Sequence, residues 1–361
     1  MILLSELVNE YYPLLLAKHG QSLLPSHHAA LAAMQTCRTE KSQMMLAQCE
    51  QCQYQTYHPH SCGHRLCSHC QHHESQLWIE RQRRKLVPAD YYMITFTLPA
   101  QLRPLAWQNQ TLIYALFFKL AWNTLKTFGL NDKKLQGILG ATGILHTHSR
   151  ELNYRLHIHF IVPAGAIDVK HNLWRKKAGN YLFNEKNLAN VFHAKWIHAI
   201  NKEKLCVKET IPTDWVVHGK HVGKGDKALT YLGKYLYRGV LPEKNILRNH
   251  NGEVTFKYTN NKNQRRTRTL PGADFLLLLL KHVLPRGFRR ARDFGFLHGN
   301  CKRRVMILQV ISRYFVLPEI KTLSSRSTFC CPRCEGQMKI IATRLPNRLA
   351  HTKSSQPLRS T

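Results

Sequence analysis

The sequence predicts an α+β fold preceded by a small cysteine-rich module, and three observations support this. Residues 138–146 and 155–162 are two strand candidates joined by a polar turn, as in a hairpin. Apolar residues recur at helical spacing over residues 108–128, and a further helical pattern covers residues 226–238. Six cysteines lie within residues 37–75, and two C-x-x-C pairs are among them.

The chain carries a strong positive charge. Its 361 residues include 53 Lys and Arg against 21 Asp and Glu, a formal net charge of +32. Such a field indicates a polyanionic partner, most simply nucleic acid, and argues against an enzyme for small neutral substrates. A hydrophobic content of 43% indicates a folded protein rather than a basic disordered tail. The length allows two or three domains.

Neither a membrane span nor an export signal is expected. The apolar run of residues 275–280 has six residues, far fewer than the roughly 20 of a membrane helix. The first 20 residues are interrupted by Glu6, Glu10 and Lys18, which predicts an amphipathic helix rather than a signal peptide. A cytoplasmic location is therefore expected. There, an odd count of 11 cysteines that includes clustered C-x-x-C pairs indicates metal binding rather than disulfides.

The order of the elements follows from local pattern. Residues 1–36 are expected to be helical, with breaks at Pro13 and Pro25. The remaining expected helices are residues 78–86, 108–128, 170–206, 226–238 and 273–284, and the remaining strand is residues 91–98. Two basic stretches, residues 253–270 and 285–304, complete the pattern, and the second contains Phe288, Phe294 and Phe296.

These elements suggest four segments. They are an N-terminal helical segment (1–36), a zinc-binding module (37–75), a large α+β domain (88–310), and a cysteine-containing C-terminal segment with a flexible tail (325–361).

The first cysteine cluster predicts a zinc site. Cys49-x-x-Cys52 and Cys67-x-x-Cys70 each supply two thiolates from a tight turn, and two such turns complete a tetrahedral site. Four thiolates leave no open position, so the site is expected to be structural. Cys37 and Cys62 remain, either as part of a second zinc site with a histidine or as buried thiols.

The second cysteine cluster is less complete. Cys331-Pro-Arg-Cys334 has the turn of a zinc knuckle, but no second C-x-x-C pair lies near it in the sequence. Cys330 or Cys301 is a possible additional ligand. A redox pair and an incomplete zinc site are the alternatives.

A pair of histidines indicates a second kind of metal site. In the strand pattern RLHIHFIV, His157 and His159 lie on one face because strand side chains alternate. His146, on the preceding strand candidate, is the expected third ligand, with His148 and Glu151 as alternatives. Such a site would leave positions open for water or a phosphate oxygen. The other interpretation is that these histidines bind no metal and are either hydrogen-bonded within the protein or exposed to solvent.

Two tyrosines are candidate nucleophiles. Tyr231 and Tyr235 are four residues apart and share a helix face, with Lys234 and Arg238 close by to hold phosphate. The alternative is an aromatic core stripe. Gly233, inside the same helix, indicates a close approach to the backbone.

Taken in order, these motifs resemble the rolling-circle transposases of the insertion sequence 91 group, in the HUH endonuclease superfamily. The resemblance covers nearly the whole chain. The matching stretches are Cys37-Arg38-Thr39, the C-x-x-C pairs, TFTLPAQLRPL (95–105), LHTHSRELNYRLHIHFIVPAGA (145–166), YLGKYLYR (231–238) and LPRGFRRARDFGFLHG (284–299).

The resemblance implies an antiparallel sheet with flanking helices and with His157 and His159 on a central strand. These histidines, with His146, would hold Mg²⁺ or Mn²⁺, while Tyr231 and Tyr235 would attack DNA and form a 5′-phosphotyrosine. It implies nicking and strand transfer of single-stranded DNA at element ends by a bacterial, nucleoid-associated protein. A plasmid replication initiator or relaxase with the same chemistry, or a non-catalytic zinc-dependent DNA-binding regulator, is the alternative.

The DNA itself is expected to contact the basic segments. Base stacking is assigned to the three phenylalanines of residues 285–304. The candidate phosphate-binding residues are Lys234, Arg238, Arg265, Arg266, Arg268, Arg289 and Arg290.

Overall fold

The computed structural model describes residues 2–39, 41–67, 70, 72–237, 240–260, 264–314 and 330–345, with only the backbone described for residues 72, 73 and 234–237. The chain forms two compact units, one of residues 1–74, 237–283 and 319–361, the other of residues 75–236 and 284–318. The expected large domain (88–310) is therefore interrupted, because residues 237–283 fold with the N-terminal unit. In the part of the chain that is described, no helix combines the length and apolar character needed to cross a membrane.

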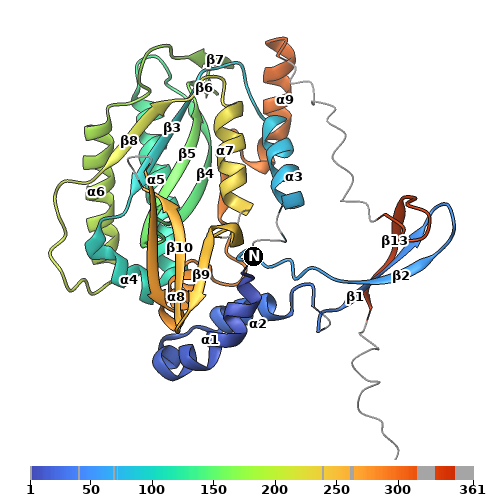
Figure 1. Cartoon of the computed structure of the whole chain (residues 1–361). Helices are drawn as coiled ribbons and strands as arrows, with labels where there is room; N and C mark the ends of the chain where they lie inside the picture. The colour runs from blue at the N-terminus through green and yellow to red at the C-terminus, as the bar shows by residue number, and fades with distance from the viewer. Residues whose placement is uncertain are drawn as a thin grey trace, which may run out of the picture. The chain divides into compact units, whose positions relative to one another are not determined.

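The second unit is built on a seven-stranded antiparallel sheet (Figure 1). Strand β4 (Ile138–His148) pairs with β5 along one edge and, along the other, with β6 at Ile138 and Leu139 and with β12 from Gly140 to Ile144. The strand order is β7 (Leu173–Lys176), β6 (Gly165–Asp168), β4, β5 (Tyr154–Pro163), β3 (Tyr91–Thr97) and β8 (Val217–His221), with β12 (Ala291–Gly295) beside β4.

Alternation along the central hairpin gives the sheet an apolar face. Leu156, Ile158 and Phe160 of β5 are fully buried and join one large core. This core is closed by α5 (Gln110–Asn131) and α6 (Glu185–Lys202), which Figure 1 draws on one side of the sheet. The side chains between these core residues, including His157 and His159, therefore face the opposite side.

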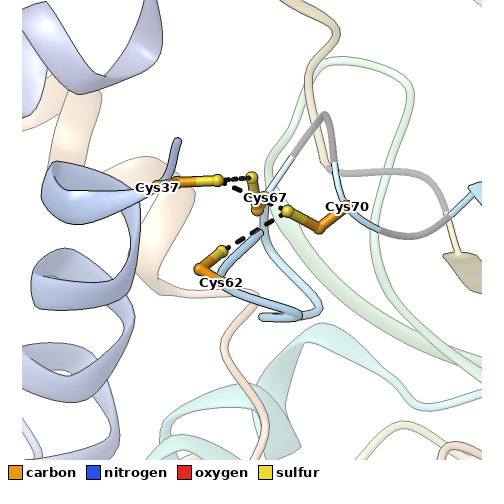
Figure 2. A group of neighbouring side chains, drawn as sticks. All are labelled: Cys37, Cys62, Cys67 and Cys70. Carbon is orange, nitrogen blue, oxygen red and sulfur yellow. Dashed lines mark hydrogen bonds between the residues drawn. The ribbon is translucent and has the colours of Figure 1, made fainter. Parts of the chain in front are cut away.

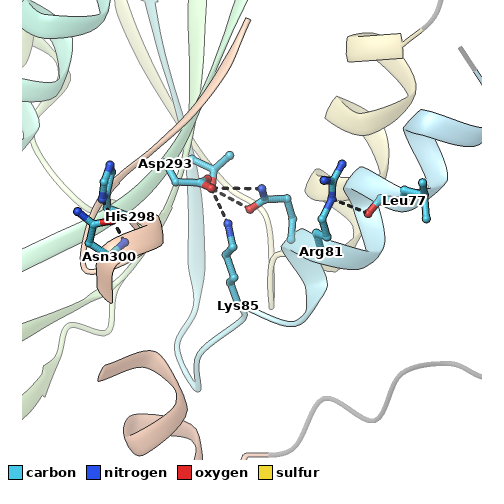
Figure 3. Close-up of polar contacts among 8 residues, drawn as sticks. Leu77, Arg81, Lys85, Asp293, His298 and Asn300 are labelled. Carbon is cyan, nitrogen blue, oxygen red and sulfur yellow. Dashed lines mark hydrogen bonds and ion pairs between the residues drawn. The ribbon is translucent and has the colours of Figure 1, made fainter. Parts of the chain in front are cut away.

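Helix α3 (His72–Arg83) covers part of that opposite face through polar contacts. The side-chain amide of Gln82 lies 3.3 Å from Thr142 Oγ1 of β4, and Asp293 of β12 accepts from Thr142 at 2.7 Å. Lys85 Nζ lies 2.5 Å from Asp293 Oδ2, a contact that Figure 3 shows beside the end of the helix. Gln82 and Thr142 are buried. Because Thr142 and His146 share a face of β4, α3 lies on the histidine side of the sheet.

Helix α7 (Asp226–Tyr237) packs against α3. Ser75 Oγ donates to the Gly233 carbonyl at 2.9 Å, and Arg83 Nε lies 2.6 Å from Asp226 Oδ1. A Cβ on Gly233 would lie 2.3 Å from Ile79 Cγ1, so the close approach expected at Gly233 is that of helix α3. These contacts connect α7 with the histidine side of the sheet, and Figure 1 draws α7 and α3 there.

The N-terminal unit contains two three-stranded sheets and three helices among its described residues. Helix α1 (Leu4–His19) is followed by α2 (Pro25–Thr36) and contacts α8 (Gly272–Leu280). The Tyr11 hydroxyl donates to Asn249 Oδ1 at 2.5 Å. One sheet has the order β11 (Arg265–Pro271), β10 (Glu253–Thr259), β9 (Ile246–His250), and the other the order β13 (Met338–Leu345), β1 (Met44–Cys49), β2 (Gln55–Pro59).

Two local expectations are wrong. Pro13 lies inside α1 rather than ending a helix, whereas Pro25 begins α2, where its missing N–H costs nothing. Residues 170–206 are not mostly helical, because β7 forms at the start and only α6 follows. The remaining helices of the described segments are α4 (Arg103–Gln108), α9 (Lys302–Ile311) and four short 3₁₀ turns.

Candidate functional site

Three histidines converge on the open face of the central hairpin. His146 of β4 stands directly opposite His157 of β5, and His159 follows two residues later on the same face. Their ring centroids are 4.3–4.9 Å apart, and one nitrogen from each ring lies within 4.8 Å of the others. His146 is buried, whereas His157 and His159 are partly exposed. The group can therefore bind one ion and remain accessible to a substrate.

Neighbouring polar groups orient two of these rings. His157 Nδ1 lies 3.2 Å from the Arg155 carbonyl oxygen, which only accepts, so this nitrogen carries the proton. His159 Nδ1 lies 2.7 Å from the hydroxyl of Thr95 on β3. Both contacts engage Nδ1 and leave Nε2 as the ligand atom, which is the usual role of outer-shell partners in metal sites.

The three rings are neutral near pH 7. Burial lowers the pKa of His157 to about 4 and that of His159 to about 3. For His146, burial lowers the pKa well below its usual value of 6.5, with a further contribution from the other two histidines. A neutral imidazole offers a lone pair without first losing a proton, so the cluster is ready for a cation.

The alternative third ligands lie elsewhere. Glu151 lies in the turn after β4, where its Oε2 accepts from the Asn153 side chain at 3.3 Å. His148 is the last residue of β4 and is not in the three-histidine group. Among the three sequence candidates, the structure brings only His146 together with His157 and His159.

Tyr231 lies on an exposed part of α7. Its side chain is 57% exposed, while Ala228, Leu229 and Leu232 form the buried side of the helix. This exposure contradicts a core-stripe role for Tyr231. The backbone of α7 continues through Tyr235, one helical turn later. The side chains of Lys234 and Tyr235, and all of Arg238, lie outside the described residues.

The basic candidates differ in accessibility. Arg265 and Arg266 are exposed on β11, Arg268 is half-buried there, and Arg289 is exposed. Arg290 is buried, unlike the other described arginine candidates, and its positive charge is among the causes that lower the pKa of His146.

The prediction that three phenylalanines stack on DNA bases is wrong. Phe288 and Phe296 are buried, and Phe294 packs against the main core, with its ring centroid 5.1 Å from that of Trp122. The stretch 285–304 is thus a core-forming segment with exposed arginines rather than a row of free aromatic rings.

The cysteines form two clusters, and their grouping corrects the predicted one. In the first, Cys37 at the end of α2 joins Cys62, Cys67 and Cys70 (Figure 2). Cys37 Sγ lies 3.4 Å from Cys70 Sγ and 3.6 Å from Cys67 Sγ, and Cys62 Sγ lies 3.7 Å from Cys70 Sγ. No histidine is needed to complete this set. The thiol of Cys62, followed by that of Cys67, lowers the pKa of Cys37 to about 7.

The second cluster combines the C-x-x-C pair at Cys49 and Cys52 with the pair at Cys331 and Cys334. The predicted site of Cys49, Cys52, Cys67 and Cys70 is therefore wrong, because its two halves belong to different clusters. Neither Cys301 nor Cys330 is part of either cluster.

The distances within both clusters suit zinc. Zinc–sulfur bonds of about 2.3 Å in a tetrahedron place the sulfurs about 3.8 Å apart. The separations in the first cluster are 3.4–3.7 Å, close to this value. A set of four thiols is also the donor set that structural zinc prefers.

Some contributing groups were not identified from the sequence. Thr95 lies in the strand predicted over residues 91–98, and its antiparallel pairing with His159 brings the two side chains together on one face, but no sequence motif marks it. The polar group of Gln82, Thr142 and Asp293 joins segments far apart in the chain, and no local pattern signals it.

Comparison with known proteins gives a consistent result. Residues 7–98 match a family model described as a transposase zinc-binding domain, and residues 140–304 match one described as a putative transposase. The chain is 26% identical over 359 residues to a putative transposase, y4qJ, of Sinorhizobium fredii, covering 89% of this chain and 90% of that protein. It is 29% identical over 265 residues to the transposase for insertion sequence element IS801 of Pseudomonas savastanoi pv. phaseolicola, covering 68% of this chain and 63% of that protein. No solved structure gives a significant match.

Proposed function

Since this chain belongs to the insertion sequence 91 family of transposases, we propose that it nicks and transfers single-stranded DNA through a tyrosine nucleophile during rolling-circle transposition. Family membership itself implies DNA binding and DNA cleavage. The observation that carries the finer proposal is the group of His146, His157 and His159, on the sheet face toward which α3 and α7 pack.

The histidine group fits a divalent cation, Mg²⁺ or Mn²⁺. Three neutral nitrogen donors on two paired strands form one side of a coordination sphere and leave the other side open. When bound there, the ion would polarise a non-bridging phosphate oxygen. Imidazole donors favour transition metals over Mg²⁺, so Mn²⁺ is expected to support activity at the lower concentration.

Tyr231 and Tyr235 are the proposed nucleophiles. A phenolic oxygen forms a bond to phosphorus and loses its proton, the bond from phosphorus to the 3′ oxygen breaks, and that oxygen leaves as a hydroxyl. A 5′-phosphotyrosine results, and the 3′ hydroxyl can later attack it to rejoin a strand. The exposure of Tyr231 supports this role because a DNA strand can reach the hydroxyl.

The test of the nucleophiles uses single-stranded DNA that carries an element end and a label on the side of the 5′ phosphate. In Mn²⁺ the wild type should form a labelled covalent adduct. Tyr231→Phe and Tyr235→Phe together should abolish it without unfolding the protein, since Phe keeps the ring. Tyr181→Phe is the matched control, because Tyr181 is also an exposed tyrosine of the same unit. An adduct that persists in the double variant would place the nucleophile elsewhere.

The test of the metal ligands uses the same substrate. His157→Ala and His159→Ala should abolish cleavage and leave DNA binding largely intact, because binding rests on exposed basic residues. His148→Ala is the control on the same hairpin. Normal cleavage by either ligand variant contradicts the assignment. A wild-type protein that binds the DNA but never cleaves it in Mn²⁺ or Mg²⁺ would instead support a DNA-binding regulator.

A further inference from the structure

We propose that Cys49, Cys52, Cys331 and Cys334 hold a structural zinc ion of their own, which joins the N-terminal module to a strand near the other end of the chain. Cys52 and Cys331 are separated by 279 positions in the sequence. The zinc-binding family model ends at residue 98 and does not include Cys331 or Cys334. This proposal is independent of the nicking chemistry.

The four sulfurs have the arrangement of a zinc ligand set. Cys49 Sγ and Cys334 Sγ are 3.5 Å apart, as are Cys52 Sγ and Cys331 Sγ, and Cys334 Sγ and Cys52 Sγ. All four lie within 4.8 Å of one another. These separations are near the ~3.8 Å expected between sulfurs around tetrahedral zinc and well above the ~2.05 Å of a disulfide.

The first C-x-x-C turn is shaped as a metal-binding knuckle. The backbone N–H groups of Gln51 and Cys52 both point at Cys49 Sγ, at 3.4 Å. Gln53 N donates to the Cys49 carbonyl at 3.2 Å, and Gln53 has a φ of 60°. N–H groups directed at a sulfur stabilise its thiolate, which is the form that binds metal.

The second turn repeats this geometry. Arg333 N points at Cys331 Sγ at 3.4 Å, and Glu335 N donates to the Cys331 carbonyl at 2.9 Å. Glu335, four residues after the first cysteine like Gln53, has a φ of 57°. The two turns share the same unusual backbone and contribute their sulfurs to one group. A thiolate–metal site requires this arrangement, whereas cysteines that are close by chance would not need it.

Among the residues that the structure describes, the sheet that carries these turns has only a small apolar core. Strand β13 pairs with β1 from Met44 to Cys49, and β1 pairs with β2. The associated core contains four buried residues, Ala47, Cys49, Cys331 and Met338, with Tyr54 packed against it. So few apolar groups rarely hold three strands together in water, and small domains of this kind commonly rely on a structural metal.

The first measurement is the zinc content of the full-length wild-type protein, purified in the presence of a reductant. We expect two zinc ions per chain, one for each cysteine cluster. Cys334→Ser should reduce the content to one, and so should Cys37→Ser in the other cluster. Cys330→Ser is the matched control, because Cys330 precedes Cys331 but its sulfur is not in the cluster, and it should keep two.

Two results overturn the proposal: a wild-type content of one zinc, or an unchanged content in Cys334→Ser. If serine variants misfold, the His157→Ala protein decides the matter, because its histidine group is incomplete and two zinc ions per chain must then come from the two cysteine clusters. Replacement by Co²⁺ should then give two ions per chain with thiolate-to-metal charge-transfer absorption. Thiol counting and intact mass that instead reveal a disulfide among these four cysteines would exclude the metal site.

A second measurement tests whether zinc joins the two segments. A protease recognition sequence is inserted after residue 322, and the purified protein is cleaved there. The fragment containing β13 should remain bound to the rest of the chain until a chelator is added. It should be lost without chelator in Cys334→Ser and retained in Cys37→Ser. A fragment that stays bound in Cys334→Ser, or after complete removal of zinc, contradicts a metal-dependent connection.

Discussion

Replacement of Gly233 by alanine tests the packing that places α7 on the histidine side of the sheet. The added Cβ would lie 2.3 Å from Ile79 Cγ1, 2.8 Å from Ile79 Cδ1 and 3.2 Å from Trp78 Cε3. Ile79 is 4% exposed and Trp78 is 6% exposed, so neither side chain can swing into solvent. Helices α3 and α7 must therefore move apart.

Two opposing terms set the size of the effect. Alanine in place of glycine inside a helix contributes about 1 kcal/mol of stability. Overpacking of a filled core costs about 1–3 kcal/mol, and the 2.3 Å approach to a fixed side chain argues for the upper part of that range. We expect a net loss of about 1–2 kcal/mol in the free energy of unfolding of this unit.

The assay is denaturant unfolding followed by tryptophan fluorescence at a fixed zinc concentration. Gly299→Ala is the control, because a Cβ there meets nothing within 4 Å. In the double variant with Ile79→Ala, the new methyl group occupies space left by the isoleucine. The combined loss should therefore be about 1–2 kcal/mol smaller than the sum of the single losses. Adduct formation by Gly233→Ala should also fall, since α7 carries Tyr231.

A more stable Gly233→Ala protein would refute this reasoning. A gain of about 1 kcal/mol is the expected result for a glycine on an open helix face. In that case α7 would not contact Ile79, and the argument that connects Tyr231 with the histidine group would lose its basis.

Three further predictions concern other sites. Asp293→Ala removes the carboxylate that accepts from Thr142 and pairs with Lys85 at the end of α3. It should lower the free energy of unfolding by about 2–4 kcal/mol in the same assay. A change below about 0.5 kcal/mol would contradict a role in holding α3. Burial lowers the pKa of His27 to about 4, so its contribution to the free energy of unfolding is fully present above pH 6.5 and falls by about 3 kcal/mol between pH 6.5 and about 4. His27→Gln should lack this component in paired pH titrations of unfolding, and identical titrations of the two proteins would contradict the assignment. Thr95→Val should raise the Mn²⁺ concentration needed for half-maximal cleavage by about 10–100-fold through loss of the contact with His159, and an unchanged Mn²⁺ requirement would exclude that positioning role.

The part of the site predicted from the sequence is the part that depends on local geometry. Period-two alternation was enough to place His157 and His159 on one face, and a short polar turn was enough to place His146 opposite them. The helix around Tyr231 followed from its spacing and from Asp226 at its start. The close approach at Gly233 was anticipated, but its partner α3 was not.

The errors arose where tertiary contacts decide. Each C-x-x-C turn was recognised correctly, but the choice of its partner is a matter of distance in space, and Cys49 pairs with a turn near the other end of the chain. Phe288 and Phe296 lie among arginines in the sequence, which led to the prediction that they stack on DNA bases. In the structure they lie on either side of β12, and both are buried. Charge near an aromatic residue carries no information about which way the ring points.

The order in which the chain is synthesised gives the β1–β13 pairing a further consequence. Strand β1 and the Cys49 turn are made early, but their partners follow 279 positions later, a delay of roughly 15–55 s at 5–20 residues per second. During that time β1 has β2 on one edge and no neighbour on the other, and an unpaired strand edge is a template for pairing with another chain. The speed of translation through the intervening residues therefore sets how long each new molecule is exposed to aggregation before its last strand arrives.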